Sequence, residues 1–276
     1  MMTQETLLKN IKAKQSYLCV GLDIDLEKVP EFIRNTEDPL FTFAKTIIDK
    51  THSYAVAYKP NLAFFESYGV DGWRAFDKIM RYLNENYPEH FTIADAKRGD
   101  IGNTAARYAK AFFENYGVDA VTVAPYMGKD AVEPFLTFKD KYAILLSLTS
   151  NPGAFDFQFT EENGKKLFEK VLQTSLKWNG AAQLMYVVGA TKASALTSIR
   201  QIIPDAFLLV PGVGAQGGSL KEVSEFGMNK SCGLLVNSSR GIIYASHEEN
   251  FADAAASEAK KIQQEMAGYL LKKGII

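Results

Sequence analysis

The segment "FTIADAKRGDIGNT", residues 91–104, joins an apolar, strand-like run to the start of an amphipathic stretch. Three charged residues of alternating sign, Asp95, Lys97 and Asp100, follow where the apolar run ends. A short apolar run, a polar turn and a helical pattern in that order are typical of one βα unit of a parallel sheet. The segment therefore predicts a buried strand whose end presents charged side chains.

The same unit recurs along the chain. Short runs rich in strand-forming residues cover residues 17–23, 55–59, 91–95, 120–125, 142–148, 183–189, 206–212 and 233–239. Amphipathic helical patterns cover residues 40–52, 73–87, 103–117, 164–180, 192–203 and 250–273. Strands that are apolar on both faces and alternate with helices call for a parallel sheet. Eight such units favour a closed (β/α)8 TIM barrel over an open, doubly wound sheet.

Composition indicates an ordinary globular protein. The 276 residues are 47% hydrophobic and 23% charged, and no linker or low-complexity tract divides them, so we expect a single domain over residues 1–276. The formal net charge of −1 provides no general attraction to nucleic acid or to a membrane surface. No window approaches the eighteen uninterrupted apolar residues of a transmembrane helix. Cys19 and Cys232 lie in or beside apolar runs. We expect a cytoplasmic protein with two buried thiols.

Polar residues gather where the predicted strands end, which is the catalytic face of this fold. They are Asp23, Lys59, Asp95, Lys97, Ser150 and Arg240. A single charged residue at a strand end is usually only solvated, but these would all meet at the same end of one barrel. The set as a whole therefore predicts an active site.

A glycine-rich segment, "PGVGAQGGS" (211–219), follows the seventh predicted strand. Its amides can approach an anion, although the segment also suits a plain turn with Ser219 as the N-cap of a helix. Arg240 after the eighth strand adds a fork of donors that suits phosphate oxygens, so a phosphorylated substrate is favoured. Neither dinucleotide nor nucleoside triphosphate motifs occur, and the three histidines lack metal-ligand spacing.

Four motifs together resemble the orotidine 5'-phosphate decarboxylase family. They are "DAKRGDIGNTA", "YKPN" with Lys59, "LTSNPGA" and "PGVGAQGG", which occur in the family's order between about Tyr17 and Tyr244. The "KRGD" segment is similar to that of the longer bacterial subgroup, whereas Gly102 stands where many members have proline. The resemblance implies decarboxylation of orotidine 5'-phosphate to uridine 5'-phosphate, the last step of de novo UMP synthesis, without metal or organic cofactor.

The resemblance also implies roles for individual residues. The catalytic set is Lys97, as proton donor, with Asp95, Asp100 and Lys59. The substrate-binding set is Asp23 and Lys59 at the ribose, Ser150 at the pyrimidine, Gln216 and Arg240 at the phosphate, and Ile101 and Thr104 in the pocket of a neighbouring subunit. The implied assembly is a homodimer with shared active sites.

The chemistry of the residues agrees with these roles. Loss of carbon dioxide leaves a carbanion that the pyrimidine ring cannot delocalise, so the protein's own cations must stabilise it. Lys97 lies between Asp95 and Asp100, which favour its charged form, so it suits a proton donor better than the amine of a Schiff-base enzyme. On an extended segment Asp95 and Lys97 face the same side, whereas a turn at Gly99 directs Asp100 elsewhere.

Two alternatives stay open at this point. Metal-dependent sugar-phosphate decarboxylases of the same barrel superfamily share the D-x-K-x-x-D pattern, but they have a glutamate that helps to hold magnesium where this sequence has Lys59. A nucleotide-binding barrel without activity would keep Arg240 and the glycines but should have lost part of the lysine and aspartate array, which is intact.

Overall fold

Eight parallel strands close into a barrel, with the order β1-β10-β9-β8-β5-β4-β3-β2 around it. The computed structural model describes residues 2–190, 193–213 and 217–276. The barrel strands are β1 (Leu18–Leu22), β2 (Ala57–Pro60), β3 (Phe91–Arg98), β4 (Ala120–Val123), β5 (Tyr142–Leu148), β8 (Leu184–Val188), β9 (Leu208–Pro211) and β10 (Leu234–Ser238). Each strand overlaps one of the eight predicted runs, so the TIM-barrel prediction is confirmed.

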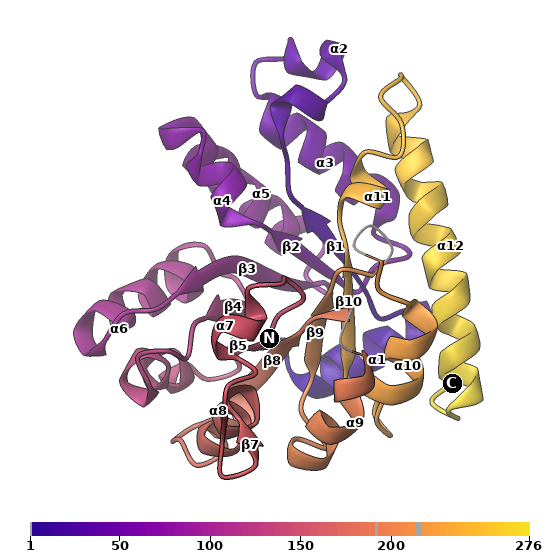
Figure 1. Cartoon of the computed structure of the whole chain (residues 1–276). Coiled ribbons are helices and arrows are strands. Elements are labelled where there is room, and N and C mark those ends of the chain that lie inside the picture. The colour runs from indigo at the N-terminus through magenta and orange to yellow at the C-terminus, as the bar shows by residue number, and fades with distance from the viewer. Residues whose placement is uncertain (1, 191–192, 214–216) are drawn as a thin grey trace.

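Helices surround the barrel on its outside (Figure 1). The described helices of the chain are α1 (Gln4–Lys14), α2 (Glu31–Arg34), α3 (Pro39–Thr51), α4 (Leu62–Glu66), α5 (Gly69–Asn86), α6 (Gly102–Lys110), α7 (Ala154–Phe157), α8 (Leu167–Ser175), α9 (Ala193–Ile202), α10 (Leu220–Gly227), α11 (Arg240–Ile243) and α12 (Phe251–Lys272). Short 3-10 turns cover η1 (Leu26–Lys28), η3 (Lys129–Ala131), η4 (Glu133–Thr137) and η5 (Ala181–Gln183). Because helices cover the sheet from outside, strands such as β1, β4, β8 and β10 are buried along their whole length.

The two ends of the barrel differ in what they carry. Lys14 of α1 lies at the end where the strands begin. Its ammonium donates to the carbonyl of His52 (2.7 Å) and lies 2.7 Å from Nε2 of His90, the residue that precedes β3. Burial lowers the pKa of Lys14 to about 8, against the opposing effect of Glu89. The polar residues described below lie at the opposite end, where the strands finish.

Two of the predicted helices differ from the structure. The pattern over 164–180 contains α8, but the helix begins only at Leu167, after a short hairpin of β6 (Glu161–Glu162) and β7 (Lys165–Lys166). Asn163 and Gly164 turn that hairpin with φ of 54° and 74°, as an Asn-Gly turn requires. The pattern over 103–117 begins as α6 but ends in a π-helical segment, η2 (Ala111–Asn115).

Three further features bear on the sequence analysis: the cysteines, the apolar character of the helices and the start of α10. Cys19 and Cys232 are both free and buried, as expected for core thiols. Among the described helices, none is both long and apolar enough to cross a membrane. Ser219 caps α10, because its side chain accepts a hydrogen bond from the amide of Glu222.

Candidate active site

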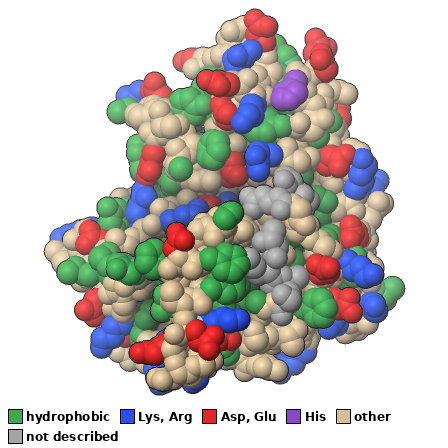
Figure 2. All heavy atoms as spheres, viewed as in Figure 1, with side chains coloured by type: hydrophobic (Ala, Val, Ile, Leu, Met, Phe, Trp, Pro, Cys, Tyr) green, Lys and Arg blue, Asp and Glu red, His purple; other side chains and the backbone are tan. Residues whose placement is uncertain are grey.

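A cavity of about 480 Å³ opens at the ends of the barrel strands. Six of the predicted site residues line it, namely Asp23, Lys59, Asp95, Lys97, Ser150 and Arg240. They come from strands and loops far apart in the sequence, which the barrel brings to one end. Figure 2 shows this face of the molecule, with basic and acidic side chains intermixed around its centre.

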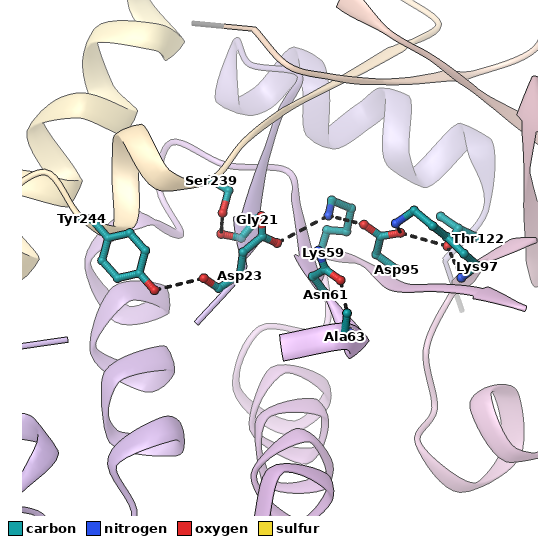
Figure 3. A network of polar contacts seen from close by, with 10 residues as sticks. All are labelled: Gly21, Asp23, Lys59, Asn61, Ala63, Asp95, Lys97, Thr122, Ser239 and Tyr244. Carbon is teal, nitrogen blue, oxygen red and sulfur yellow. Dashed lines mark hydrogen bonds and ion pairs between the residues drawn. The ribbon is translucent and has the colours of Figure 1, made fainter. Parts of the chain in front are cut away.

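The centre of the cavity is an alternating row of charges (Figure 3). Lys59 Nζ lies 2.7 Å from Asp95 Oδ2, and Lys97 Nζ lies 2.5 Å from Asp95 Oδ1. The hydroxyl of Thr122 on β4 also donates to Asp95 Oδ1, at 3.0 Å. Lys59 is 3% exposed, so its ammonium is a buried cation, whereas the Lys97 side chain is half-exposed toward the cavity. Asp95 therefore binds one buried and one accessible ammonium.

Electrostatics keep the members of this row charged. Burial alone would raise the pKa of Asp95, but Lys59 and Lys97 outweigh it and hold that pKa well below its usual range. Burial would likewise lower the pKa of Lys59, but Asp95 and Asp23 outweigh it and raise that pKa above its usual range. At neutral pH the aspartate is a carboxylate and Lys59 is an ammonium.

The backbone at Lys97 differs from the extended conformation that the sequence suggested. Its φ is 47°, in the left-handed region, and the pairing of β3 with β4 shifts register between Ala94 and Arg98. A non-glycine residue there costs about 1–2 kcal/mol, so surrounding contacts must maintain it. One such contact is the hydrogen bond from the Lys97 amide to Thr122 Oγ1 (2.9 Å). The ammonium reaches Asp95 through this bend rather than through strand alternation.

Asp23 lies beyond Lys59 in the same row, with Oδ1 3.9 Å from Lys59 Nζ. The hydroxyl of Tyr244 fixes the loop around it by donating to the carbonyl of Asp23 (3.0 Å) and accepting from the amide of Asp25 (2.7 Å). Two buried oxygens in this part of the cavity, Asp23 Oδ1 and Asn237 Oδ1, have no hydrogen-bond partner among the described residues. Unpaired buried acceptors inside a cavity suit the hydroxyl groups of a ligand.

Ser150 and Arg240 line the cavity at some distance from this row. Ser150 follows β5 and is backed by Gly189, where a Cβ atom would lie 2.6 Å from the Ser150 amide nitrogen. Arg240 begins α11 and is exposed, and no ion pair joins it to another described residue. Its guanidinium is therefore accessible to an anion.

The remaining predicted site residues lie elsewhere. Asp100, Ile101 and Thr104 do not line the cavity of their own chain. Asp100 Oδ1 accepts a hydrogen bond from the Ile101 amide (2.7 Å), and Ile101 is 56% exposed. Gln216 lies outside the described residues, so its predicted contact with phosphate stays a prediction.

Sequence reasoning missed several cavity residues, among them Asn61, Thr122, Asn237 and Tyr244. A signal existed for two of them, because Thr122 is the one polar residue of β4 and Asn237 directly follows the apolar residues of β10. Asn61 follows Lys59 in the "YKPN" motif, and its side chain accepts from the Ala63 amide at the start of α4. Tyr244 carries no local signal, because its role comes from contacts with residues more than 200 positions away.

The residues described do not form an evident metal site. Within residues 2–190, 193–213 and 217–276, no group of three or more His, Cys, Asp or Glu side chains is arranged to hold a metal ion. The two carboxylates of the cavity, Asp23 and Asp95, instead face the ammonium of Lys59.

Comparison with known proteins gives concordant matches along nearly the whole chain. Residues 16–255 match the model of the "Orotidine 5'-phosphate decarboxylase / HUMPS family". The orotidine 5'-phosphate decarboxylase of Christiangramia forsetii is 60% identical over 271 residues, which cover 98% of this chain and 100% of that protein. That of Flavobacterium johnsoniae is 61% identical over 266 residues, covering 96% and 97%.

Solved structures agree with these sequence matches. The OMP decarboxylase of Leishmania donovani superposes with a TM-score of 0.79 at 37% identity, covering 95% of this chain and 100% of that one. A putative orotidine-monophosphate decarboxylase of Toxoplasma gondii superposes with a TM-score of 0.85 at 33% identity, covering 97% and 98%.

Proposed function

We propose that this chain, which belongs to the orotidine 5'-phosphate decarboxylase / HUMPS family, decarboxylates orotidine 5'-phosphate. It is a carboxy-lyase, and its product is uridine 5'-phosphate, so the reaction completes de novo UMP synthesis. The observation that carries the proposal is the row of Lys59, Asp95 and Lys97 at the mouth of the barrel. It provides fixed cations where the reaction develops negative charge.

Lys97 is the proton donor in this proposal. When the bond to the carboxyl carbon breaks, its electron pair stays on the ring carbon, and carbon dioxide leaves. The Lys97 ammonium stabilises that carbanion and then transfers a proton to it, and Asp95 keeps the ammonium in place at 2.5 Å. Lys59, buried on the other side of Asp95, keeps this carboxylate ionised throughout.

Metal-dependent sugar-phosphate decarboxylases of the same barrel superfamily are the nearest alternative, and Lys59 argues against that activity here. The position that helps those enzymes to hold a metal is occupied by a buried lysine, which is paired to Asp95 and lies near Asp23. An ammonium between two carboxylates opposes the binding of a divalent cation at the same place. We therefore propose catalysis without a metal or an organic cofactor.

Substrate contacts follow from the placement of polar groups around the row. Asp23 and Lys59 are proposed to bind the ribose hydroxyls, which is supported by the unpaired Oδ1 of Asp23. Ser150 is proposed to meet the pyrimidine edge, and Arg240, together with Gln216, to bind the phosphate. Binding energy gained at the phosphate then stabilises the transition state at the distant ring carbon.

We further propose a cytoplasmic homodimer in which Asp100, Ile101 and Thr104 enter the site of the partner. The position of Asp100 outside its own cavity supports this arrangement. The whole chain, residues 1–276, is proposed to be one barrel domain that binds neither nucleic acid nor membranes, in keeping with its net charge of −1.

The decisive measurement is the absorbance change of orotidine 5'-phosphate with purified protein, with and without a chelator. We expect equal rates of decarboxylation in both conditions. Activity that disappears with EDTA and returns with magnesium would indicate a metal-dependent enzyme. Binding of the nucleotide without turnover would indicate a catalytically silent barrel.

A further inference from the structure

Arg98 directly follows Lys97 and points away from the cavity, although it belongs to the same "KRGD" segment. Its side chain is 20% exposed and turns back along the chain, so that one guanidinium nitrogen donates to the carbonyl of Ala96 at 2.9 Å. Ala96 and Arg98 flank Lys97. The hydrogen bond therefore bridges the residue whose φ is 47°.

The guanidinium is itself held from two sides. Its second terminal nitrogen forms an ion pair with Glu66, the last residue of α4. The rings of Tyr108 on α6 and Phe112 lie beneath it, with centroids 5.4 and 5.7 Å from the guanidinium carbon. A planar fork that bonds in two directions and stacks on aromatic rings has little freedom to move. Two outer segments thus fix the bridge across Lys97.

The main chain of Arg98 is fixed as well. Its carbonyl accepts from the amide of Ala124 (2.8 Å), just after β4. Two hydrogen bonds thereby hold the backbone around Lys97. The one from Arg98 to Ala96 fixes the residue before Lys97, and the one from Ala124 to Arg98 fixes the residue after it. The backbone sets the direction in which the Lys97 side chain leaves the chain, so these contacts keep its ammonium within reach of Asp95.

We propose that Arg98 is a positioning residue that holds the left-handed backbone at Lys97 and so aims the Lys97 ammonium at Asp95 and the reacting carbon. Arg98 does not line the cavity, and its side chain bonds to Ala96 and Glu66 rather than to Asp95, so it acts only through Lys97. The inference rests on the proposed function, in which Lys97 donates the proton.

The test compares Arg98→Met with wild-type protein in three measurements: kcat for orotidine 5'-phosphate, the dissociation constant for uridine 5'-phosphate, and Tm. Methionine keeps the unbranched stem against Tyr108 and Phe112 but lacks the donors. We expect kcat to fall about tenfold or more, because small displacements of a catalytic group are costly. Product affinity should change by less than about threefold, because Arg98 does not line the cavity.

Two further variants separate geometry from charge. Arg74→Met removes an exposed arginine that is paired to Asp71 on the outer face of α5, and it should leave kcat unchanged. Arg98→Lys retains the charge, but one ammonium cannot reproduce the fork between Ala96 and Glu66, so kcat should fall by a comparable factor. Full activity of Arg98→Lys would show that only charge matters and would overturn the inference.

Other outcomes also decide the question. The inference fails if Arg98→Met keeps wild-type kcat. It also fails if kcat and the amount of uridine 5'-phosphate bound both fall in proportion to the fraction of protein that is folded, because the variant would then only destabilise the fold. Wild-type protein in the same assay distinguishes this failure from that of the proposed function. If wild-type protein does not decarboxylate the substrate, the proposed function is wrong and the inference falls with it.

Discussion

Lys97 combines an unfavourable backbone with an accessible ammonium. Its φ of 47° is maintained by neighbouring contacts, and its side chain is bonded to Asp95 while remaining half-exposed to the cavity. Strain of this kind is retained at functional sites when the surroundings determine the conformation. The ammonium is thus fixed in direction and still reachable by a substrate.

Lys97→Ala should abolish turnover and leave nucleotide binding largely intact. Alanine has a similar backbone preference, and the lost side chain contacts Asp95 rather than the core. We expect kcat to fall well below a tenth of the wild-type value, a loss of more than about 1.4 kcal/mol of transition-state stabilisation. Affinity for uridine 5'-phosphate should change by less than about threefold, since the product lacks the reacting carboxylate. A variant that keeps more than about a tenth of kcat would exclude Lys97 as the proton donor.

Site residues were predictable where the signal is local and not where it is tertiary. Asp23, Lys59, Asp95 and Arg240 could be found because each lies at or just after the end of an apolar run. The bend at Lys97 was not predictable, because contacts that hold it depend on residues distant in the sequence: Thr122 lies 25 positions from Lys97, and Glu66 lies 32 positions from Arg98.

At the scale of elements, the strands were easier to predict than the boundaries of helices. Strands buried on both faces must be apolar throughout, so their positions are evident in the sequence. The hairpin at Asn163 and Gly164 was missed, although the Asn-Gly pair is a turn signal, because the flanking strands are two residues long and polar. The π-helical segment after α6 is a local irregularity without a marked composition.

The ends of β5 and β8 illustrate how strand packing places a binding residue. Gly189 follows β8, and its amide donates to the carbonyl of Leu148 at the end of β5 (2.9 Å). A Cβ atom at position 189 would lie 2.6 Å from the amide nitrogen and 2.8 Å from the Cβ of Ser150. Only glycine permits the loop after β5 to lie this close to β8.

Gly189→Ala should therefore displace Ser150 and weaken binding of the pyrimidine. We expect KM for orotidine 5'-phosphate and the dissociation constant for uridine 5'-phosphate to rise together, in contrast to Lys97→Ala. The steric conflict should also lower the free energy of unfolding by about 1–3 kcal/mol. Gly268→Ala on α12, where an added Cβ meets no atom within 4 Å, is the matched control. Unchanged KM in Gly189→Ala would show that the loop accommodates the methyl group without moving Ser150.

At the scale of the whole molecule, exposed apolar side chains follow two neighbouring strands of the barrel. Ile101 after β3 is 56% exposed, and Tyr126 and Met127 after β4 are 93% and 45% exposed. Exposed apolar side chains that gather on one face can mark an interface between subunits. Asp100 directly precedes Ile101, so an interface that covers Ile101 would bring Asp100 toward a partner rather than toward its own cavity.

A two-fold interface with shared sites predicts complementation between inactive variants. Lys97→Ala and Asp100→Ala, each nearly inactive alone, are mixed under conditions in which differently tagged subunits exchange. Each heterodimer then contains one site with both residues changed and one site with Lys97 from one chain and Asp100 from the other. With equal mixing, half of the dimers are heterodimers and half of their sites are intact, so about a quarter of wild-type activity should return. If tag exchange is complete and the mixture stays inactive, Asp100 acts within its own subunit, and the exposed region beside Ile101 does not join two active sites.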